Sequence, residues 1–395
     1  MPSAPAVQIS AETRALADEV VALRREFHRH PELDFDLPWT AGRVAEHLEG
    51  LGLTVHTGIG RSGVVGVLEG GRPGPTALYR ADMDALPLQE ETGLPFASEI
   101  PGRMHACGHD GHVAVALTLA KRLHARRATL PGKVAFLFQP AEEGAGGARE
   151  MIADGVLDLM KPDACFAMHL INEEEYGCVG VHPGPVFAGS GEFRVELASA
   201  GGHGAMPHTT VDLIVVAAQM ITALQSVVAR NVDPLATIVV TVGQVQIGTK
   251  TNILPTSGWF AGTIRYYDAA ENERVVKRVD ELLGGVARAH GAGYRFAYEP
   301  GYPATVNDAR VAGLARAAVA EVAQVTEYRT MGSEDMSYFL ERVPGCYYTV
   351  GSRNPAKGKV HGHHSGSFDI DEDALVLGVE VGARVLEAYL GSAGR

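Results

Sequence analysis

The chain has 395 residues, of which 46% are hydrophobic and 21% are charged, so it is long enough for two domains and apolar enough for a sizeable core. Its formal net charge of -13 argues against a nucleic-acid partner, because nucleic-acid binding requires clustered Lys and Arg. The four cysteines have no paired spacing, the N-terminus has neither region of a signal peptide, and no apolar run of about 18 residues appears. We therefore expect a soluble, cytoplasmic protein without a membrane span.

The chain begins with two predicted helices. Apolar residues at helical spacing predict the first from Leu16 to Phe27, and Thr40 is the expected N-cap of the second, which runs toward Gly50. The next segments alternate between strand and helix: strands at 76–79, 133–138 and 164–168, and helices after His112 and near Ala148. Such alternation predicts βαβ units and a mostly parallel sheet that is buried on both faces, hence the α/β class.

Residues 192–299 have a different order of elements and predict an inserted domain. The expected elements are a strand at 193–197, a helix at 211–229, strands at 236–245 and 259–265, a helix at 272–290 and a strand at 294–298. This βαββαβ order is the ferredoxin-like pattern, an antiparallel sheet with two helices on one face. We therefore expect a main domain in two parts, 1–188 and 303–395, interrupted by a satellite domain at 189–302.

Residues 58–63 match the GxGxxG pattern of dinucleotide-binding proteins. A dinucleotide site requires a helix directly after the glycines, because the helix N-terminus holds the pyrophosphate. Here Val64 to Leu68 follow, and they predict a strand. We therefore predict a hairpin turn at this position, which argues against a dehydrogenase.

Residues 105–112 are the most informative segment, because they contain three histidines, one cysteine and one aspartate. Imidazole and thiolate suit zinc or a neighbouring transition metal, whereas calcium and magnesium prefer oxygen ligands. A His-rich surface turn or a lone redox cysteine is the alternative. A metal site needs further ligands from the rest of the chain.

Three of the predicted strands lead into residues that can bind metal. These residues are, in chain order, Asp82 and Asp84, Glu142 and Glu143, and His169. Because ligands bind at the carboxyl ends of the strands in open α/β sheets, the three segments should meet at one crevice. The loop with Cys107 and His109 lies just before a helix and should be on the same rim.

The adjacent acids Glu142 and Glu143 have a chemical interpretation. In an extended segment, neighbouring side chains point in opposite directions, so one carboxylate can bind metal while the other faces the substrate. A carboxylate beside a metal-bound water is the general base that amide hydrolysis requires. The alternative is a pair of exposed acids near a helix N-terminus.

Six motifs resemble, in their order, those of the dinuclear metal amidohydrolases: residues 27–33 (FHRHPEL), 80–87 (RADMDALP), 104–112 (MHACGHDGH), 139–144 (QPAEEG), 201–208 (GGHGAMPH) and 331–335 (MGSED). That family includes hippurate hydrolases, N-acyl-amino-acid amidohydrolases (aminoacylases) and plant indoleacetyl-amino-acid hydrolases. The resemblance extends over nearly the whole chain. It implies a catalytic domain of the Zn-peptidase type with an inserted ferredoxin-like satellite domain, and it implies a homodimer, with a tetramer as the alternative.

The resemblance also implies ligands for two divalent metal ions, namely Cys107, His109, Glu143, His169 and one C-terminal histidine. We predict that this C-terminal ligand is His364, because it directly precedes the Ser-x-x-Phe-Asp run. His363 and His361 are the alternative ligands. The family more often has proline where Gly366 stands. Zinc, manganese, cobalt and nickel all remain candidates, because ligand type narrows the choice of metal but availability decides it.

By the same resemblance, Glu142 is the base that takes a proton from a metal-bridging water and gives it to the leaving amine. His203 resembles the histidine that stabilises the tetrahedral oxyanion, from the same subunit or from its partner. Asn252 and Arg265 match substrate-side positions, where a guanidinium can hold the α-carboxylate of an acyl-amino acid. Asp84 is expected to orient a ligand or the metal pair.

The expected function is hydrolysis of the amide bond of N-acyl-amino acids, with release of a carboxylic acid and an amino acid. A dipeptidase or carboxypeptidase with the same metal chemistry is the first alternative. A non-catalytic binding protein on the same scaffold is the second. The expected partner is thus a small molecule, and neither nucleic acid nor a membrane is expected.

Overall fold

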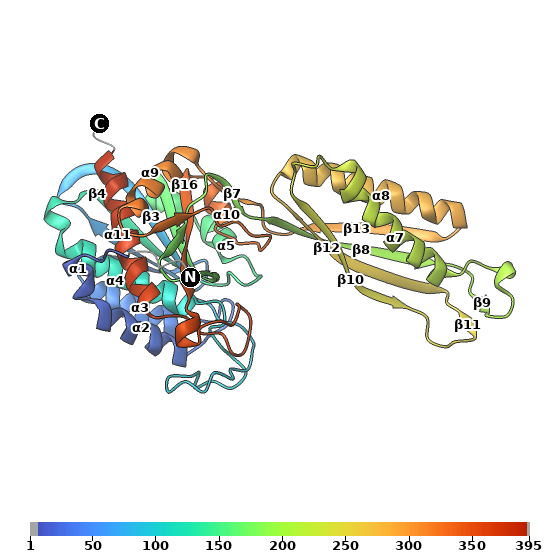
Figure 1. Cartoon of the computed structure of the whole chain (residues 1–395), viewed down its shortest axis with the longest axis horizontal. Helices are drawn as coiled ribbons and strands as arrows, with labels where there is room; N and C mark the ends of the chain where they lie inside the picture. Colours follow the sequence, from blue (N-terminus) through green and yellow to red (C-terminus); the bar gives the residue numbers. More distant parts are fainter. Residues whose placement is uncertain (1–6, 393–395) are drawn as a thin grey trace. The chain divides into compact units, whose positions relative to one another are not determined.

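The structure, a computed structural model, describes residues 7–392. The expectation that the chain has no signal peptide concerns residues 1–6, which lie outside the described range together with 393–395. The chain divides into two compact units (Figure 1). Unit 1 contains the chain up to Val186, Val306–Arg329 and the chain from Asp335, whereas unit 2 contains Phe187–Thr305 and Thr330–Glu334.

Unit 1 is built on an eight-stranded sheet with the order β1-β2-β4-β3-β5-β16-β6-β15. The strands are β1 (Thr54–Ile59), β2 (Gly63–Glu69), β3 (Arg72–Asp82), β4 (Pro131–Gln139), β5 (Ala164–Glu175), β6 (Cys178–Gly180), β15 (Gln324–Thr326) and β16 (Gly345–Arg353). The central strands β4, β3, β5 and β16 are parallel, which confirms the predicted α/β class with a mostly parallel sheet. β1 and β2 form an antiparallel hairpin with Ile59 opposite Gly63, so the GxGxxG segment is a turn, as predicted.

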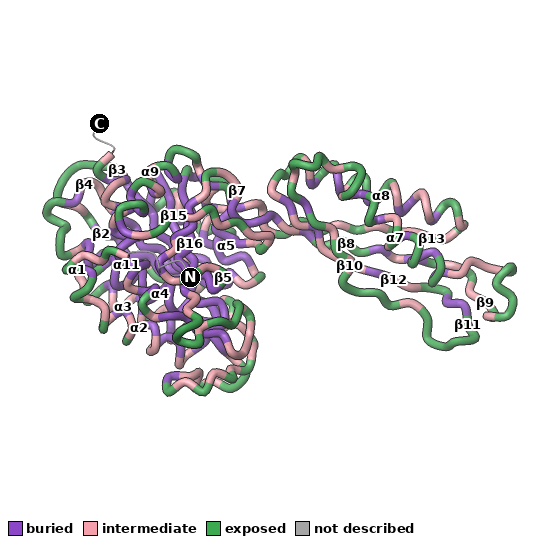
Figure 2. Tube along the Cα trace, viewed as in Figure 1, coloured by how far each residue is buried: buried purple, intermediate pink, exposed green. Residues whose placement is uncertain are grey.

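The helices of unit 1 pack against this sheet and against one another. They are α1 (Ala11–Arg14), α2 (Ala17–Arg29), α3 (Pro38–Gly50), α4 (His109–Ala125), α5 (Gly147–Ala153), α6 (Val156–Met160), α9 (Ala309–Ala320), α10 (Ser337–Leu340) and α11 (Asp373–Ser392), with short 3-10 turns at Arg127–Thr129 and Pro355–Lys357. α4 is apolar on nearly every side and is almost wholly buried, because it packs against β3 and β4 and against α2 and α11. The buried residues of unit 1 form one continuous core around the sheet (Figure 2).

Unit 2 contains a four-stranded antiparallel sheet with the order β10-β12-β8-β13. Its elements are β8 (Gly189–Ala198), α7 (Leu213–Asn231), β10 (Ile238–Ile247), β12 (Ser257–Tyr266), α8 (Ala269–His290) and β13 (Gly293–Pro300). Its short elements are β9 (Gly202–His203), the 3-10 turn Pro207–Thr209 and β11 (Ile253–Leu254). The short strands β7 (Gly184–Phe187) and β14 (Thr305–Asn307) contain the residues at which the chain passes from one unit to the other. The βαββαβ order is the predicted ferredoxin-like pattern, with α7 and α8 side by side over the sheet (Figure 1).

α7 is, in the described part of the chain, the one helix that is long and apolar enough to cross a membrane by length and composition. Asp212 caps its N-terminus by accepting hydrogen bonds from the backbone of Ile214 and Val215. Its inner face, which includes Val216 and Met220, is buried in the core of unit 2. One face of α7 is thus buried in the core of unit 2, while Ile214 and Val215 near its N-terminus are exposed.

Candidate metal centre

The predicted ligands of unit 1 come together in space. Cys107, His109 and His169 form one group whose ligand atoms lie within 4.8 Å of one another, and Cys107, Glu143 and His364 form a second such group. Cys107 belongs to both groups, so its thiolate lies where one sulfur can contact two ions. Glu142 lies beside these groups, because His109, Glu142 and Glu143 also meet within the same distance.

The local backbone explains how Cys107 and His109 reach the same site. Gly108 lies between them with a φ of 89°, a left-handed conformation that glycine adopts without steric cost. α4 begins directly afterwards at His109. The sharp turn at Gly108 therefore directs both side chains to one side of the helix N-terminus.

Hydrogen bonds fix which ring nitrogen of each histidine is available to a metal. His109 Nδ1 donates to the backbone oxygen of Asp84 at 2.8 Å, which leaves Nε2 as the lone-pair nitrogen. His169 Nδ1 donates to the oxygen of Leu170 at 2.7 Å, and its Nε2 lies 3.6 Å from the Cys107 sulfur. Both Nε2 atoms therefore face the thiol, in the orientation that a shared metal site requires.

The other two histidines of the 105–112 run have different surroundings. His112 Nδ1 contacts Asp82 at 2.6 Å and its Nε2 accepts from the backbone of Leu170 at 3.0 Å, so both ring nitrogens are engaged within the protein. His105 is buried, and neither of its nitrogens has a hydrogen-bond partner among residues 7–392. Burial lowers the pKa of His105 to about 4, so this ring is neutral at pH 7.

Asp84 holds the two adjacent acids in place. Its carboxylate accepts from the backbone nitrogen of Glu142 at 3.0 Å and from that of Glu143 at 3.1 Å. The predicted extended geometry of this pair is wrong: the two residues lie in a turn that follows Ala141, whose φ is 55°. The turn forms because one carboxylate binds two successive N–H groups, and it places both acids on the same side, near His109.

His169 also differs from its predicted position. We expected it directly after a strand, but β5 continues to Glu175, so His169 lies inside the strand. It pairs with Thr349 because β16 runs parallel to β5 over nearly its full length. A neighbouring strand from the far end of the chain thus extends β5 beyond the point where its apolar run stops.

The buried donor atoms satisfy a chemical test for a divalent transition metal. His109 Nε2 and Glu143 Oε1 are buried without a hydrogen-bond partner in the described chain, and they lie 3.9 Å apart. Burial raises the pKa of the Cys107 thiol well above its usual value and raises the pKa of Glu143 to about 7. Imidazole, thiolate and carboxylate are the ligands of zinc and related ions, and a cation here would stabilise the charged forms that burial disfavours.

The three C-terminal candidates lie in different environments. His364 has a φ of 60°, donates its backbone N–H to Ala106 at 2.8 Å, and places Nε2 3.5 Å from Glu143. His363 Nε2 instead donates to the backbone oxygen of Leu170 at 2.9 Å. His361 is exposed and is in none of the ligand groups that the described residues form. The geometry therefore favours His364 among the three.

Two residues support the site without having been assigned a role from the sequence. Asp335 accepts from Gln139 Nε2 at 2.8 Å and from the backbone of Ala148 at 2.9 Å, so it ties together both ends of the loop that carries Glu142. Arg80 donates to Asp335 at 2.8 Å. Arg80 lies in the motif 80–87 and Asp335 in the motif 331–335, so their place in these motifs is the feature of the sequence that could have identified them.

The predicted residues of unit 2 are not all in one place. His203 in β9 pairs with Ile253 of β11, next to Asn252, and both His203 and Asn252 are exposed. Arg265 lies near the other end of the sheet, opposite Ser190 of β8, and donates to the hydroxyl of Ser333. His203 and Asn252 are thus neighbours, whereas Arg265 is separated from them by the length of β12.

The fold and the paired ligand groups are those of a metal-dependent hydrolase. Residues 78–388 match Peptidase family M20/M25/M40. The chain is 42% identical to an N-acyl-L-amino acid amidohydrolase of Geobacillus stearothermophilus over 301 residues, which are 75% of this chain and 81% of the relative. It is 36% identical to thermostable carboxypeptidase 1 of Saccharolobus solfataricus over 94% of this chain and 95% of the relative.

A solved structure agrees with these matches. The YXEP protein of Bacillus subtilis, described as a dinuclear metal binding peptidase from the M20 family, superimposes with a TM-score of 0.85 and 32% identity, over 96% of this chain and 99% of that one. The chain belongs to the M20/M25/M40 peptidase family. It is a metal-dependent amidohydrolase that acts on a small-molecule substrate, and the predicted resemblance is confirmed.

Proposed function

We propose that this enzyme hydrolyses the amide bond of N-acyl-amino acids, with residues 1–188 and 303–395 as the catalytic domain and 189–302 as the satellite domain. The observation that carries the proposal is the pair of ligand groups that share Cys107, with Glu142 beside them. The name of the Geobacillus relative supports the acyl-amino-acid substrate. The carboxypeptidase relative supports the alternative, a peptidase with the same chemistry. We further propose that the enzyme is soluble and cytoplasmic.

In the proposed mechanism, Cys107, His109 and His169 would hold one divalent ion, and Cys107, Glu143 and His364 would hold the other. Such ions would supply Lewis acidity, which would lower the pKa of the attacking water and polarise the substrate carbonyl. Glu142 takes a proton from that water as its oxygen bonds to the carbonyl carbon. Glu142 then gives the proton to the amine nitrogen as the C–N bond breaks, so a carboxylic acid and an amino acid are released.

His203 and Arg265 have roles on the substrate side in this proposal. His203 donates a hydrogen bond to the tetrahedral oxyanion, with its neighbour Asn252 as a further substrate contact, and Arg265 binds the free carboxylate of the amino acid. From Ser257 to Arg265, β12 spans about 27 Å at roughly 3.4 Å per residue. An acyl-amino acid is about two residues long, or roughly 7 Å. His203 and Arg265 of one chain therefore do not meet the same substrate, and we propose that His203 acts from a second copy, together with its neighbour Asn252.

The surface of unit 2 supports a homodimer. Among the described residues, most of the exposed large hydrophobic side chains belong to this unit: Met206, Ile214, Val215, Leu235, Val239, Val245 and Ile253. β10 is an edge strand, so its outer N–H and C=O groups are free to pair with another strand. Exposed apolar side chains together with an open sheet edge support an interface between identical chains, and a tetramer is the alternative assembly.

A mixed dimer tests the action of His203 from the second copy. Glu142→Gln and His203→Ala chains are co-expressed with two different tags, and the dimer that carries both tags is isolated. We expect each parent to be nearly inactive and the mixed dimer to recover about half of the wild-type turnover, because one of its two sites has both residues intact. A mixed dimer that stays as inactive as its parents contradicts action in trans, and a monomer in solution contradicts the dimer.

The substrate proposal is tested with metal-stripped enzyme. Zinc, manganese, cobalt or nickel is added back, and release of amino acid from N-acetyl- and N-benzoyl-amino acids is compared with cleavage of dipeptides. We expect metal to restore hydrolysis of the acyl substrates, and the metal that gives the highest turnover is then the candidate for the native ion. Restored cleavage of dipeptides alone supports the peptidase alternative, and metal binding without any hydrolysis contradicts the proposed function.

A further inference from the structure

In the segment 361–369, which we call the ligand loop because it carries His364, one buried side chain bonds both ends. Asn172 Nδ2 donates to the backbone oxygen of His361 at 2.8 Å and to that of Asp369 at 2.9 Å. Asn172 Oδ1 accepts from the hydroxyl of Ser352 at 2.7 Å. The amide thus uses both of its N–H groups on the two ends of the ligand loop.

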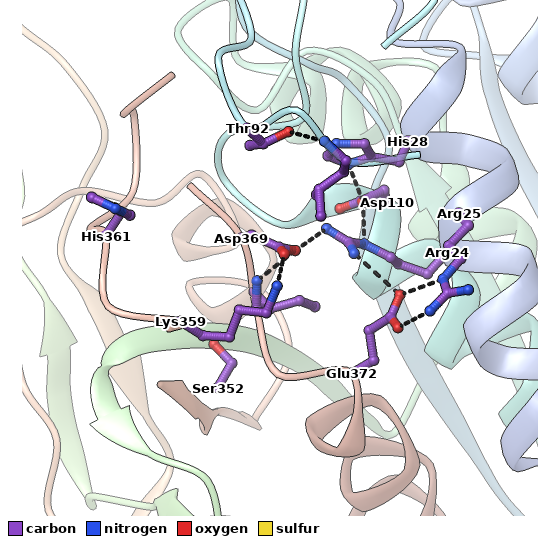
Figure 3. Close-up of polar contacts among 12 residues, drawn as sticks. Arg24, Arg25, His28, Thr92, Asp110, Ser352, Lys359, His361, Asp369 and Glu372 are labelled. Atoms are coloured by element: carbon purple, nitrogen blue, oxygen red, sulfur yellow. Dashed lines mark hydrogen bonds and ion pairs between the residues drawn. The ribbon is translucent and has the colours of Figure 1, made fainter. Parts of the chain in front are cut away.

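Arg24 is a second anchor of the same loop, and Figure 3 shows it among three carboxylates. The guanidinium of Arg24 is fully buried and donates to Asp369 at 3.0 Å, to Asp110 at 2.8 Å and to Glu372 at 3.3 Å. Asp110 directly follows His109 in α4. Arg24 therefore links the C-terminal end of the ligand loop to the helix that begins with a proposed metal ligand.

The ligand loop needs these anchors because His364 itself is weakly held. Its side chain is exposed, and its φ of 60° is left-handed, a conformation that is unfavourable for a residue with a Cβ atom. One backbone hydrogen bond, to Ala106, fixes it near Cys107. The imidazole lies within reach of Cys107 and Glu143, so the position of the loop sets the position of this side chain.

We propose that Asn172 is a positioning residue for the metal centre: its carboxamide fixes the ligand loop so that His364 is preset to complete the group with Cys107 and Glu143. The proposal rests on the proposed function, in which His364 is a ligand. Asn172 lies in β5, three residues after His169, so the rigid strand that carries one ligand also orients the loop that carries another. Asparagine suits this position because it supplies two N–H donors and one acceptor in one plane.

The test is metal binding to stripped protein carrying Asn172→Asp, measured by calorimetric titration with zinc. Aspartate has the same shape but places a carboxylate oxygen against two carbonyl oxygens, so the loop loses both anchoring bonds. We expect one of the two ions to bind about 10–100-fold more weakly, the usual effect of losing a partner that orients a ligand, while the other ion binds as in the wild type. Asn172→Ala serves as a second variant should the aspartate variant not fold.

The chain offers a matched control in Asn307. This second buried asparagine also donates to two backbone oxygens, those of His182 at 2.9 Å and Tyr347 at 2.8 Å, and accepts from the backbone of Tyr347 at 2.7 Å. Asn307→Asp makes the same chemical change away from the ligand loop. We expect both variants to lower the melting temperature of the metal-free protein, but only the Asn172 variants to weaken metal binding.

His364→Ala separates a failure of this inference from a failure of the proposed ligand set. The positioning role is supported if His364→Ala and Asn172→Asp each weaken binding of the same ion and the double variant binds that ion no more weakly than the single variants. If His364→Ala weakens one ion but both Asn172 variants bind two ions as tightly as the wild type, the inference is overturned. If His364→Ala itself leaves both ions unaffected, the proposed ligand set is wrong and the inference is overturned with it.

Discussion

Replacement of Glu142 by glutamine is expected to lower kcat for an N-acyl-amino acid by about 10²–10⁴-fold while both metal ions stay bound. The amide keeps the size of the side chain, and the backbone N–H bond from residue 142 to Asp84 does not depend on the side chain. What is lost is the group that accepts the proton of the attacking water and returns it to the amine. Steady-state kinetics with parallel metal analysis measures both quantities.

Glu150→Gln is the control for this charge change. Glu150 lies in α5, the helix that follows the same loop, and it is in none of the metal-ligand groups among residues 7–392. Its variant should retain wild-type turnover. Full activity of Glu142→Gln with two ions bound would show that another group acts as the base, and loss of metal from this variant would mean that Glu142 is a ligand.

Replacement of Cys107 by alanine is expected to weaken binding of both metal ions, not just one. Cys107 is the only residue common to the two proposed ligand sets, so its loss removes one donor from each. Structural zinc sites bind with about 10–16 kcal/mol shared over four ligands, so one ligand contributes roughly 3 kcal/mol, or about 100-fold in affinity. Metal content after dialysis against a buffered concentration of free zinc measures the effect, and turnover should fall in parallel.

The matched control is Cys178→Ala. Cys178 is a half-buried free cysteine in β6 that belongs to no ligand group in the described chain. Its variant should keep two ions. If Cys107→Ala retains one ion at wild-type affinity, Cys107 is not shared between the two ions, and the proposed geometry of the centre is wrong.

Much of the fold could be predicted because its signals are local. The alternation of apolar strands with amphipathic helices predicted the central sheet, and the βαββαβ order predicted the sheet and helices of unit 2. A dinucleotide site needs a helix directly after the glycines, and the residues after Gly63 predicted a strand instead, which the structure contains. Each of these features depends on residues close together in the chain.

The metal centre was only partly predictable, because tertiary contacts decide which of several similar residues can bind a metal. Residues 105–112 offer three histidines of the same type, and only hydrogen bonds to distant residues distinguish them. Asp82 and Leu170 engage both nitrogens of His112, whereas the backbone of Asp84 leaves one nitrogen of His109 available. The turn at Glu142 has the same kind of cause, since it depends on the carboxylate of Asp84.

The sequence alone determined the class of this protein, because motifs such as Cys107-Gly108-His109 and the acid pair at Glu142 encode ligand chemistry within a few residues. Only the tertiary structure decided how far β5 extends past His169, since β16 supplies the pairing, and which C-terminal histidine faces the thiol. The physical reason is that hydrogen bonds and burial join residues far apart in the chain. Local spacing carries no information about those contacts.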